Sequence, residues 1–86
     1  MILAFEDAGW EDYRWWADQS RATRRRVDKL IDSALRTPFE GLGKPERLTG
    51  PLRGSWSRRV TGEHRLVYRV EGDVLVIVQV RYHYSE

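Results

Sequence analysis

The sequence predicts an α+β protein in which two N-terminal helices pack on one face of a twisted, mainly antiparallel sheet, in the order β-α-α-β-β-β. Residues 74–80 form an apolar, β-branched run that is typical of a central strand. Residues 27–35 repeat apolar side chains at helical spacing, and short turns at 61–63 and 71–73 separate three strand-like segments. The 86 residues are expected to form one domain, residues 1–86.

The N-terminal segment predicts a short strand and a first helix. Residues 2–5 are apolar, and Asp7 is a candidate cap for the helix that follows. The buried face of this helix is expected to consist of Trp10, Tyr13 and Ala17. Trp15 and Trp16 cannot both point inward with that face. Local pattern does not decide whether residues 2–5 join the sheet beside the last strand.

The second helix has the clearest periodicity. Ser20 is a good N-cap, and Pro38 ends the helix after Thr37 because the residue before a proline is pushed out of helical geometry. Its apolar stripe is Val27, Leu30, Ile31, Ala34 and Leu35. Four arginines, at 21, 24, 25 and 26, form either a solvated helix face or a contact for a polyanion.

A loop rich in glycine and proline connects the helices to the remaining strands. Seven of the eighteen residues at 38–55 are Gly or Pro, and a few apolar side chains among them can hold the loop in place. The segment Gly43-Lys44-Pro45-Glu46 is not a phosphate-binding P-loop, because the G-x-x-x-x-G-K-[ST] spacing is absent.

Three strands then follow, at 56–60, 64–70 and 74–84. In the last strand, Leu75, Ile77, Gln79, Arg81 and His83 alternate with a valine-rich set, and the valine-rich face is expected to take the helices. The turn at 71–73 would place Arg65 opposite residues 79–81, so that it can approach Arg81 and His83. Such a cationic group calls for an anion or a carboxylate such as Glu46.

Composition excludes several classes of function. The chain has no cysteine and two histidines, so disulfides, thiolate zinc sites and a convincing metal cage are not expected, and no cofactor is expected. Without a recognisable secretory signal or an apolar stretch near the ~20 residues that span a bilayer, we expect a cytoplasmic protein that does not contact membranes. Thirteen of the fifteen cationic residues are Arg, which suits phosphate contact.

Glu, Arg, His and Tyr together suit metal-free cleavage of RNA. A carboxylate can take the proton of the 2′-hydroxyl, an Arg can stabilise charge on the phosphorus, and a His can protonate the departing 5′-oxygen. The substrate supplies its own nucleophile, so DNA could not react. Taken singly, each candidate has a plain structural interpretation as a solvated or packing side chain.

These residues lie in motifs that strongly resemble the YoeB (Txe) toxins of the RelE superfamily. The motifs are Arg-Thr-Pro-Phe-Glu-Gly at 36–41, Gly-Lys-Pro-Glu-Arg-Leu at 43–48, Gly-Ser-Trp-Ser-Arg-Arg at 54–59, Glu-His-Arg-Leu-Val-Tyr at 63–68 and Arg-Tyr-His-Tyr at 81–84. The resemblance covers essentially the whole chain. The chain departs from it at Ser85-Glu86, which extends past the usual final tyrosine and could crowd the site modestly.

The resemblance implies a RelE-like, microbial-ribonuclease-like fold and a ribosome-dependent endoribonuclease that cuts messenger RNA. It implies that Glu46 is the general base, His83 the general acid, Arg65 the transition-state clamp, and Tyr84 a substrate-orienting group. Supporting contacts to RNA are assigned to Lys44, Arg58, Arg59 and Arg81. The implied partners are mRNA on the ribosome, an acidic antitoxin of the YefM type, a second copy in a homodimer, and operator DNA only through the antitoxin complex.

Two other functions remain open at this point. ParE-like toxins share the architecture and act on DNA gyrase, but they lack the Glu/Arg/His/Tyr set. A non-enzymatic module that binds RNA or protein would use Trp15, Trp16 and Trp56 as interface anchors and the basic groups as phosphate contacts.

Overall fold

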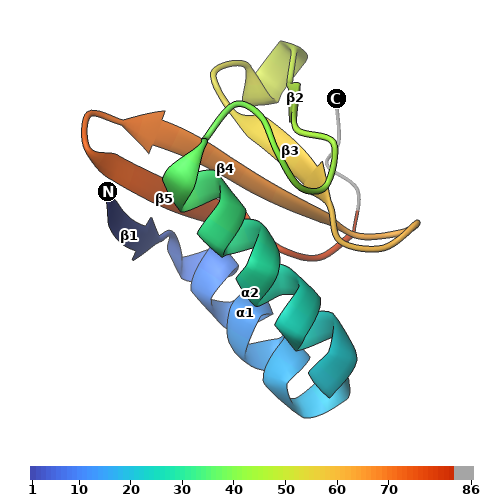
Figure 1. Cartoon of the computed structure of the whole chain (residues 1–86). Helices are drawn as coiled ribbons and strands as arrows, with labels where there is room; N and C mark the ends of the chain where they lie inside the picture. The colour runs from blue at the N-terminus through green and yellow to red at the C-terminus, as the bar shows by residue number, and fades with distance from the viewer. Residues whose placement is uncertain (83–86) are drawn as a thin grey trace.

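The computed structural model describes residues 1–82 and shows two helices packed against one five-stranded mixed sheet (Figure 1). The first half consists of β1 (Ile2–Phe5), α1 (Asp7–Gln19) and α2 (Arg21–Arg36). The second half consists of β2 (Glu46–Arg47), the short 3₁₀ helix η1 (Gly50–Leu52), β3 (Trp56–Arg59), β4 (Arg65–Glu71) and β5 (Val74–Gln79). The predicted α+β class and element order are confirmed, with β2 as an additional two-residue strand inside the Gly/Pro loop.

The sheet has the strand order β1-β5-β4-β3-β2. The three C-terminal strands form the predicted antiparallel meander, and β1 pairs in parallel with β5 from Ile2–Val74 to Phe5–Ile77. The question that local pattern left open is therefore answered, because residues 2–5 join the sheet beside the last strand. This pairing makes β5 a central strand, as its continuous apolar run indicates.

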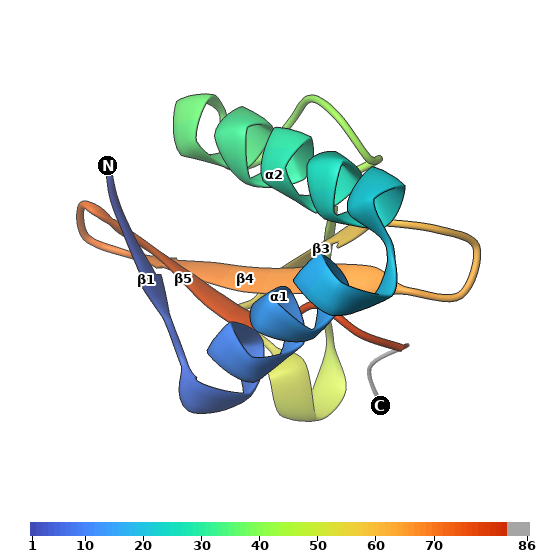
Figure 2. The same cartoon turned by 90° about the horizontal axis from the view of Figure 1, so that it is seen from below.

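Helix α2 covers one face of the sheet, as the view in Figure 2 shows. Its N-cap is Ser20, whose side chain accepts a hydrogen bond from Thr23 N, as predicted. The predicted apolar stripe faces inward: Val27, Leu30 and Ala34 have no exposed surface. They pack into the main core with residues of the strands, namely Leu66, Tyr68, Leu75, Ile77 and Val80.

The expectation that the valine-rich face of β5 takes the helices is wrong. Leu75 and Ile77 point to the helices, and Val76 lies outside the main core cluster. The reason is the register of β4 with β5, which sets Leu75 opposite Val70 and Ile77 opposite Tyr68, on the side of the main core. After Ile77 a β-bulge shifts this register, because Tyr68 pairs with Ile77 whereas Val67 pairs with Gln79. The extra residue, Val78, inverts the alternation, so Val80 rejoins the helix side.

Helix α1 lies along β5 where β1 ends. Glu6 N donates to Ile77 O at 2.9 Å, and the next turns of α1 satisfy the backbone of Val80 through side chains. Asp12 Oδ2 accepts from Val80 N at 2.9 Å, and Trp16 Nε1 donates to Val80 O at 2.8 Å. The helix therefore closes an edge of β5 that would otherwise be open to another strand.

Close packing of α1 against β5 requires Gly9. A Cβ atom at Gly9 would lie 2.3 Å from Ile77 O, closer than side-chain carbons approach a backbone oxygen.

Two expectations for α1 are corrected by its placement along β5. Trp16 is the buried tryptophan, whereas Trp10 and Ala17 are exposed, and the helix is capped by Glu6 without a side-chain bond. Among the described residues, no helix is long and apolar enough to cross a membrane.

Candidate functional site

The sheet face opposite α2, called the open face below, carries Glu46 in line with three residues of the neighbouring strands. Glu46 pairs with Ser57, Ser57 pairs with Val67, and Val67 pairs with Gln79. Residues that are directly opposite in antiparallel strands point to the same face. Glu46 is exposed at the end of this row, and Val67 is fully buried within it.

Arg65 lies on the same face, one row further along β4. Strands lie about 4.8 Å apart and rise about 3.4 Å per residue, so the Cα atoms of Glu46 and Arg65 are roughly 12 Å apart. That span matches the reach of the two side chains plus one phosphate group. The Arg65 guanidinium donates through Nη1 to Thr61 O at 3.2 Å and to His64 O at 3.4 Å, so the turn before β4 orients it.

Arg59 is the partner of Arg65 across β3 and β4, which places a second guanidinium on the open face. It is exposed, and its backbone is held on both sides. Arg59 N donates to Gly43 O at 2.8 Å, and Arg59 O accepts from Arg26 Nη2 at 3.0 Å. Two cations side by side repel each other when the face is empty and are stabilised together by an anion.

Lys44 and Glu46 are positioned by the tight turn before β2. Lys44 is exposed and has a positive φ of 53°, a left-handed conformation that a lysine rarely adopts. Gly43 next to it has a φ of 84°, and a Cβ atom there would lie 2.6 Å from Leu30 Cδ2. The glycine allows the loop to press against α2, which directs the next residues onto the sheet edge.

The assignment of Arg58 to RNA contact is corrected by the structure. Its side chain has no exposed surface and points to the helix side, opposite to Arg59. All five guanidinium N–H groups have neutral acceptors: Tyr68 Oη, Ser33 Oγ, Leu42 O, Thr37 O and Glu40 O, at 2.7–3.0 Å. Arg58 therefore holds the 37–42 loop to the sheet and cannot contact a substrate.

Tyr68 is the second member of this buried network. Its hydroxyl accepts from Arg58 Nε and donates to Pro38 O at 2.6 Å. Burial raises the pKa of the Tyr68 hydroxyl, and the hydrogen bond from Arg58 opposes this shift. Sequence reasoning missed the network because Arg58 and Tyr68 sit in strands where alternation alone does not distinguish a buried arginine from an exposed one.

The end of β5 places Arg81 on α1 instead of on Arg65. The Arg81 guanidinium carbon lies 3.8 Å from the ring centre of Trp15 and 5.1 Å from that of Tyr82. Beyond the last paired residue of β5, Arg65 N donates to Tyr82 O at 3.1 Å, so position 65 faces 82 and not 79–81. The contact of Arg81 with RNA stays a prediction. His83 and Tyr84, the predicted acid and orienting group, lie outside the described residues.

Two residues that sequence reasoning passed over lie beside this site. Ser57 Oγ is buried and has no hydrogen-bond partner among residues 1–82. His64 is half-buried, and its Nδ1 accepts a hydrogen bond from Tyr82 N at 2.7 Å. The sequence signal for both was their position: Ser57 lies inside the Gly-Ser-Trp-Ser-Arg-Arg motif, and His64 precedes Arg65.

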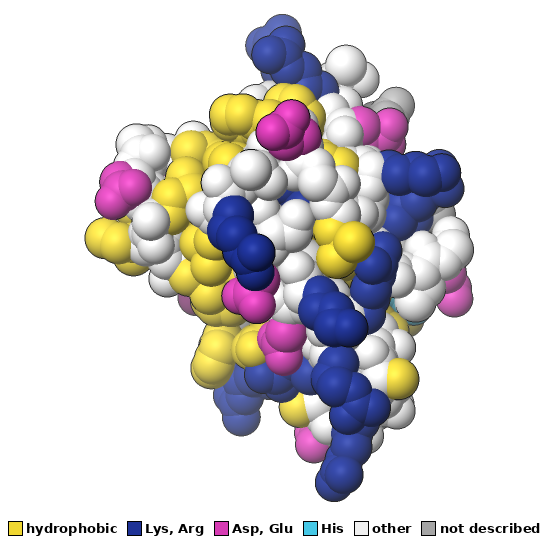
Figure 3. Space-filling model, in the orientation of Figure 1, with side chains coloured by type: hydrophobic (Ala, Val, Ile, Leu, Met, Phe, Trp, Pro, Cys, Tyr) yellow, Lys and Arg dark blue, Asp and Glu magenta, His cyan; other side chains and the backbone are white. Residues whose placement is uncertain are grey.

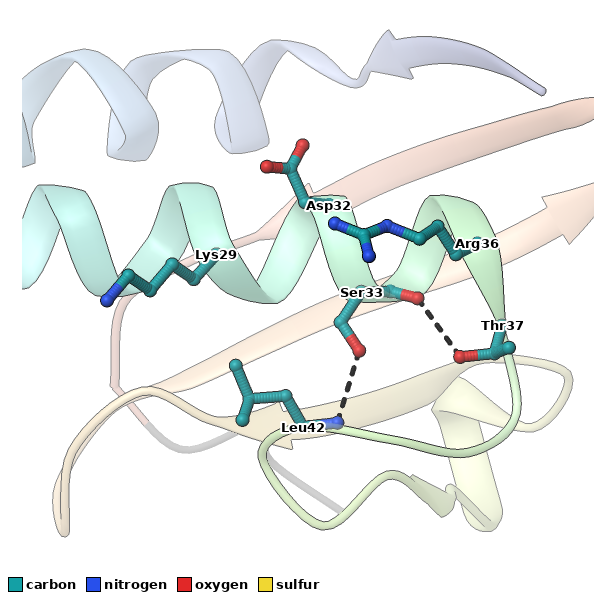
Figure 4. Close-up of a pocket in the computed structure, with 6 residues that line it drawn as sticks. All are labelled: Lys29, Asp32, Ser33, Arg36, Thr37 and Leu42. Atoms are coloured by element: carbon teal, nitrogen blue, oxygen red, sulfur yellow. Dashed lines mark hydrogen bonds between the residues drawn. The ribbon is translucent and has the colours of Figure 1, made fainter.

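A separate depression between α2 and the 38–43 loop is a poor candidate for the chemistry. Its lining residues are Lys29, Asp32, Ser33, Arg36, Thr37 and Leu42 (Figure 4). Ser33 and Thr37 are occupied by loop-closing bonds, including Leu42 N to Ser33 Oγ at 3.1 Å. Within residues 1–82, no cluster of three or more His, Asp or Glu side chains could hold a metal ion.

The arrangement on the open face can bind an anion and act on a group beside it. Glu46 is an exposed carboxylate that can accept a proton, and Arg65 and Arg59 provide charge on the same face. Sequence reasoning grouped Glu46 with Arg65 and assigned Arg59 only a supporting contact to RNA, whereas the strand register places all three residues on one face.

Comparison with known proteins gives consistent matches over nearly the full chain. The family described as "YoeB-like toxin of bacterial type II toxin-antitoxin system" matches residues 5–84. The toxin YoeB of Streptomyces coelicolor is 52% identical over 98% of this chain and 100% of its own length. The toxin YoeB of Escherichia coli K12 is 48% identical over the same shares.

Solved structures agree in fold. A YoeB/ParE toxin from Agrobacterium tumefaciens superposes with a TM-score of 0.94 at 46% identity, covering 98% of this chain and 100% of that one. The toxin in a YoeB–YefM complex from Staphylococcus aureus gives a TM-score of 0.89 at 35% identity, covering 98% of each chain.

Proposed function

The chain belongs to the YoeB-like toxins of bacterial type II toxin–antitoxin systems, and from this premise we propose that it is a ribosome-dependent endoribonuclease that cleaves messenger RNA. The single observation that carries the proposal is the placement of Glu46, Arg59 and Arg65 on one open sheet face. A binding module needs the cations, but it does not need a carboxylate in reach of the same phosphate.

The proposed chemistry is attack by the 2′-hydroxyl of the substrate on its own 3′-phosphate. Glu46 takes the proton of that hydroxyl, and Arg65 stabilises the charge that develops on the phosphorane-like oxygens. His83 donates a proton to the departing 5′-oxygen, and Tyr84 orients the substrate. The products are a 2′,3′-cyclic phosphate, or the 3′-phosphate after its hydrolysis, and a free 5′-hydroxyl. No cofactor or metal ion takes part in this scheme.

Contacts outside the reacting atoms are proposed for exposed cations. Lys44 and Arg59 are exposed beside Glu46 and Arg65, and they would contact RNA phosphates. Figure 3 shows Lys and Arg side chains in a column that begins over the N-terminal half of α2. Three of the exposed cations of this helix follow at spacings of four residues, namely Arg21, Arg25 and Lys29. Such a column suits a nucleic-acid backbone of the kind that a ribosome presents.

The proposed protein partners follow the solved relatives. The YoeB of Staphylococcus aureus occurs in a complex with YefM, in a heterotetrameric YoeB–YefM assembly and as a dimer. For this chain we propose neutralisation by an acidic, YefM-like antitoxin, self-association to a homodimer, and contact with operator DNA only through the antitoxin complex. The cationic open face favours an acidic segment as the inhibitor.

The decisive experiment adds the protein to translating ribosomes and maps 5′ ends on the message. We expect new 5′ ends with the parent and a reduction of cleavage by about 10²–10⁴-fold with Glu46→Gln, Arg65→Ala or His83→Ala. Glu40→Gln and Arg53→Ala are matched controls, because both residues are exposed and carry no proposed role. If the three site variants cleave as well as the parent, the nuclease proposal fails.

Two further arms test the chemistry. A 2′-deoxy substitution at the cleaved nucleotide should abolish cleavage, because the attacking group is missing. Cleavage of a minimal RNA without ribosomes should be unaffected by EDTA, and sensitivity to the chelator there would overturn the metal-free scheme. Loss of gyrase supercoiling with intact messages would support the ParE-like alternative instead.

A further inference from the structure

Two backbone groups of Tyr82 are held by Arg65, the first residue of β4, and by His64, which precedes it. Tyr82 N donates to His64 Nδ1 at 2.7 Å, and Arg65 N donates to Tyr82 O at 3.1 Å. The imidazole thus takes the place that a backbone carbonyl would occupy in an ordinary strand pair. Tyr82 is the last residue that the structure describes, and the chain continues directly into His83 and Tyr84.

This pair of bonds holds Tyr82 in an unfavourable conformation. Its φ is 58°, in the left-handed region that a tyrosine adopts only when the surroundings impose it, at a cost of about 1–3 kcal/mol. In this conformation the N–H and C=O groups of Tyr82 reach two adjacent residues, His64 and Arg65. The two bonds therefore offset the strain.

The acceptor on His64 is itself fixed by the surrounding structure. Thr61 Oγ1 accepts from His64 N at 3.1 Å, which sets the backbone of the residue. The ring lies edge-on to Trp16 at 4.9 Å, and Trp16 is anchored to Val80 O. A tilted contact with the Tyr82 ring at 5.2 Å closes the other side. Because Nδ1 accepts, the neutral ring carries its proton on Nε2.

We propose that His64 is a positioning residue for the cleavage reaction: its Nδ1 holds Tyr82 in the left-handed conformation and so fixes the direction in which the chain leaves toward His83 and Tyr84. The inference rests on the proposed function, in which these two residues supply the proton and orient the substrate. His64 touches neither the substrate nor the reacting atoms in this proposal. Its effect is on the placement of groups, for which about 1 Å of error costs up to about 10²-fold in rate.

Two variants of His64 separate the hydrogen bond from the ring. Asn places its side-chain oxygen where Nδ1 stands, whereas Gln places its oxygen near the position of Nε2. Both remove the ring contact with Trp16, so they serve as matched partners. We expect His64→Gln to lower the kcat for ribosomal cleavage about 10–100-fold with KM within about 3-fold of the parent. We expect His64→Asn to restore kcat to within about 3-fold of the parent.

Equal losses in the two variants would overturn the proposal, because they would trace the effect to the ring. Parent-like activity of His64→Gln would overturn it as well. A loss that appears only in KM would also contradict it, because a positioning residue acts on the reacting geometry of the bound complex.

A second measurement does not use activity. Amide hydrogen exchange, followed by NMR on the intact free protein, should show the Tyr82 amide protected in the parent and in His64→Asn, and unprotected in His64→Gln. A Tyr82 amide that exchanges freely in the parent would overturn the inference, even if the variants fold poorly. A parent that shows this protection but cuts no message sinks the proposed nuclease and leaves the hydrogen bond intact.

Discussion

The two faces of the sheet carry arginines in neighbouring positions that meet opposite environments. Arg58 and Arg59 are consecutive in β3, so the pleat sends one to the helix side and the other to the open face. Arg58 has no exposed surface and satisfies every N–H within the protein. Arg59 is exposed opposite Arg65. The same residue type is thus structural on one face and available for an anion on the other.

Burial of Arg58 is possible because acceptors from the end of α2 and from the following loop surround its guanidinium. One of its acceptors is the carbonyl of Thr37, the C-cap of α2, and another is the hydroxyl of Ser33 in the last turn of that helix. Unpaired carbonyls at this end give a helix its partial negative charge. The guanidinium satisfies the Thr37 carbonyl and places a positive charge at that end of the helix. None of the ion pairs found among the described residues involves Arg58, so loop carbonyls and helix end together replace water around the charge.

The largest expected effect in stability is on the helix side. Replacing Arg58 by Met keeps the length of the side chain but removes five donated hydrogen bonds, and only three of the acceptors, Ser33 Oγ, Thr37 O and Glu40 O, keep another donor among the described residues. We expect a loss of about 4 kcal/mol or more, enough to deplete the folded state of a protein of this size. Urea unfolding followed by tryptophan fluorescence measures it. A change below about 1 kcal/mol would show that the network does not hold the 37–42 loop.

The same substitution on the open face should separate activity from stability. We expect Arg65→Met to lower cleavage about 10²–10³-fold while unfolding free energy changes by less than about 1 kcal/mol. The reason is that, within residues 1–82, the Arg65 guanidinium donates to two carbonyls of the turn before β4 and to no other group. Ribosomal cleavage and urea unfolding on one preparation provide both values. Equal instability of Arg65→Met and Arg58→Met would remove the contrast between the faces.

An intermediate effect is expected for Tyr68→Phe, which removes two buried hydrogen bonds and should cost about 1–3 kcal/mol at neutral pH. Burial raises the folded pKa of Tyr68 above the unfolded value near ~10, so its contribution is complete below pH ~10 and declines as pH rises toward the folded pKa. Stability of the parent should therefore fall above pH ~10, and more steeply than that of Tyr68→Phe.

A second tyrosine also contributes to the loss of stability at alkaline pH. The pKa of Tyr13 is also raised, mainly by burial, and Tyr13 is present in both proteins. Tyr68→Phe should therefore retain part of the alkaline decline. Unfolding in urea at several values between pH 8 and 11 measures the two slopes, and identical slopes would contradict the assignment of the alkaline decline to Tyr68.

The smallest effect is expected at Ser57, on the open face beside Glu46. Its buried hydroxyl has no partner within residues 1–82, so Ser57→Ala should leave stability unchanged or raise it by up to about 1 kcal/mol. Thermal unfolding provides the measurement. A destabilisation above about 1 kcal/mol would point to a hydrogen bond that the described residues do not provide.

Much of the fold could be predicted because its signals are local. The stripe from Val27 to Leu35, the Ser20 cap and the two short turns act over a few residues, and each was found where predicted. The candidate site was only partly predictable. Glu46 and Arg65 were named from chemistry and resemblance, but their common face depends on the pairing of β2 with β3 and of β3 with β4.

The errors have tertiary origins, in the β4–β5 register and in the packing of α1. The bulge at Val78 adds one residue to β5 and inverts the alternation of the residues that follow it. A valine is common in regular strands, so the sequence does not predict a bulge at this position. From that point, Val80 is in the core and position 82 stands against Arg65. Trp16 was chosen over Trp10 for burial by the fit of α1 along β5, not by helical periodicity.

By itself, the sequence determined the elements, their order and the residue types that carry the proposed chemistry, because propensity, periodicity and motif are properties of neighbouring residues. The tertiary structure decided which arginine is buried, which face is open and how His64 meets Tyr82. These outcomes depend on contacts between residues that are 10 to 25 positions apart, from Arg58 with Tyr68 to Arg58 with Ser33. Burial and hydrogen bonding over such separations exist only once the chain has folded.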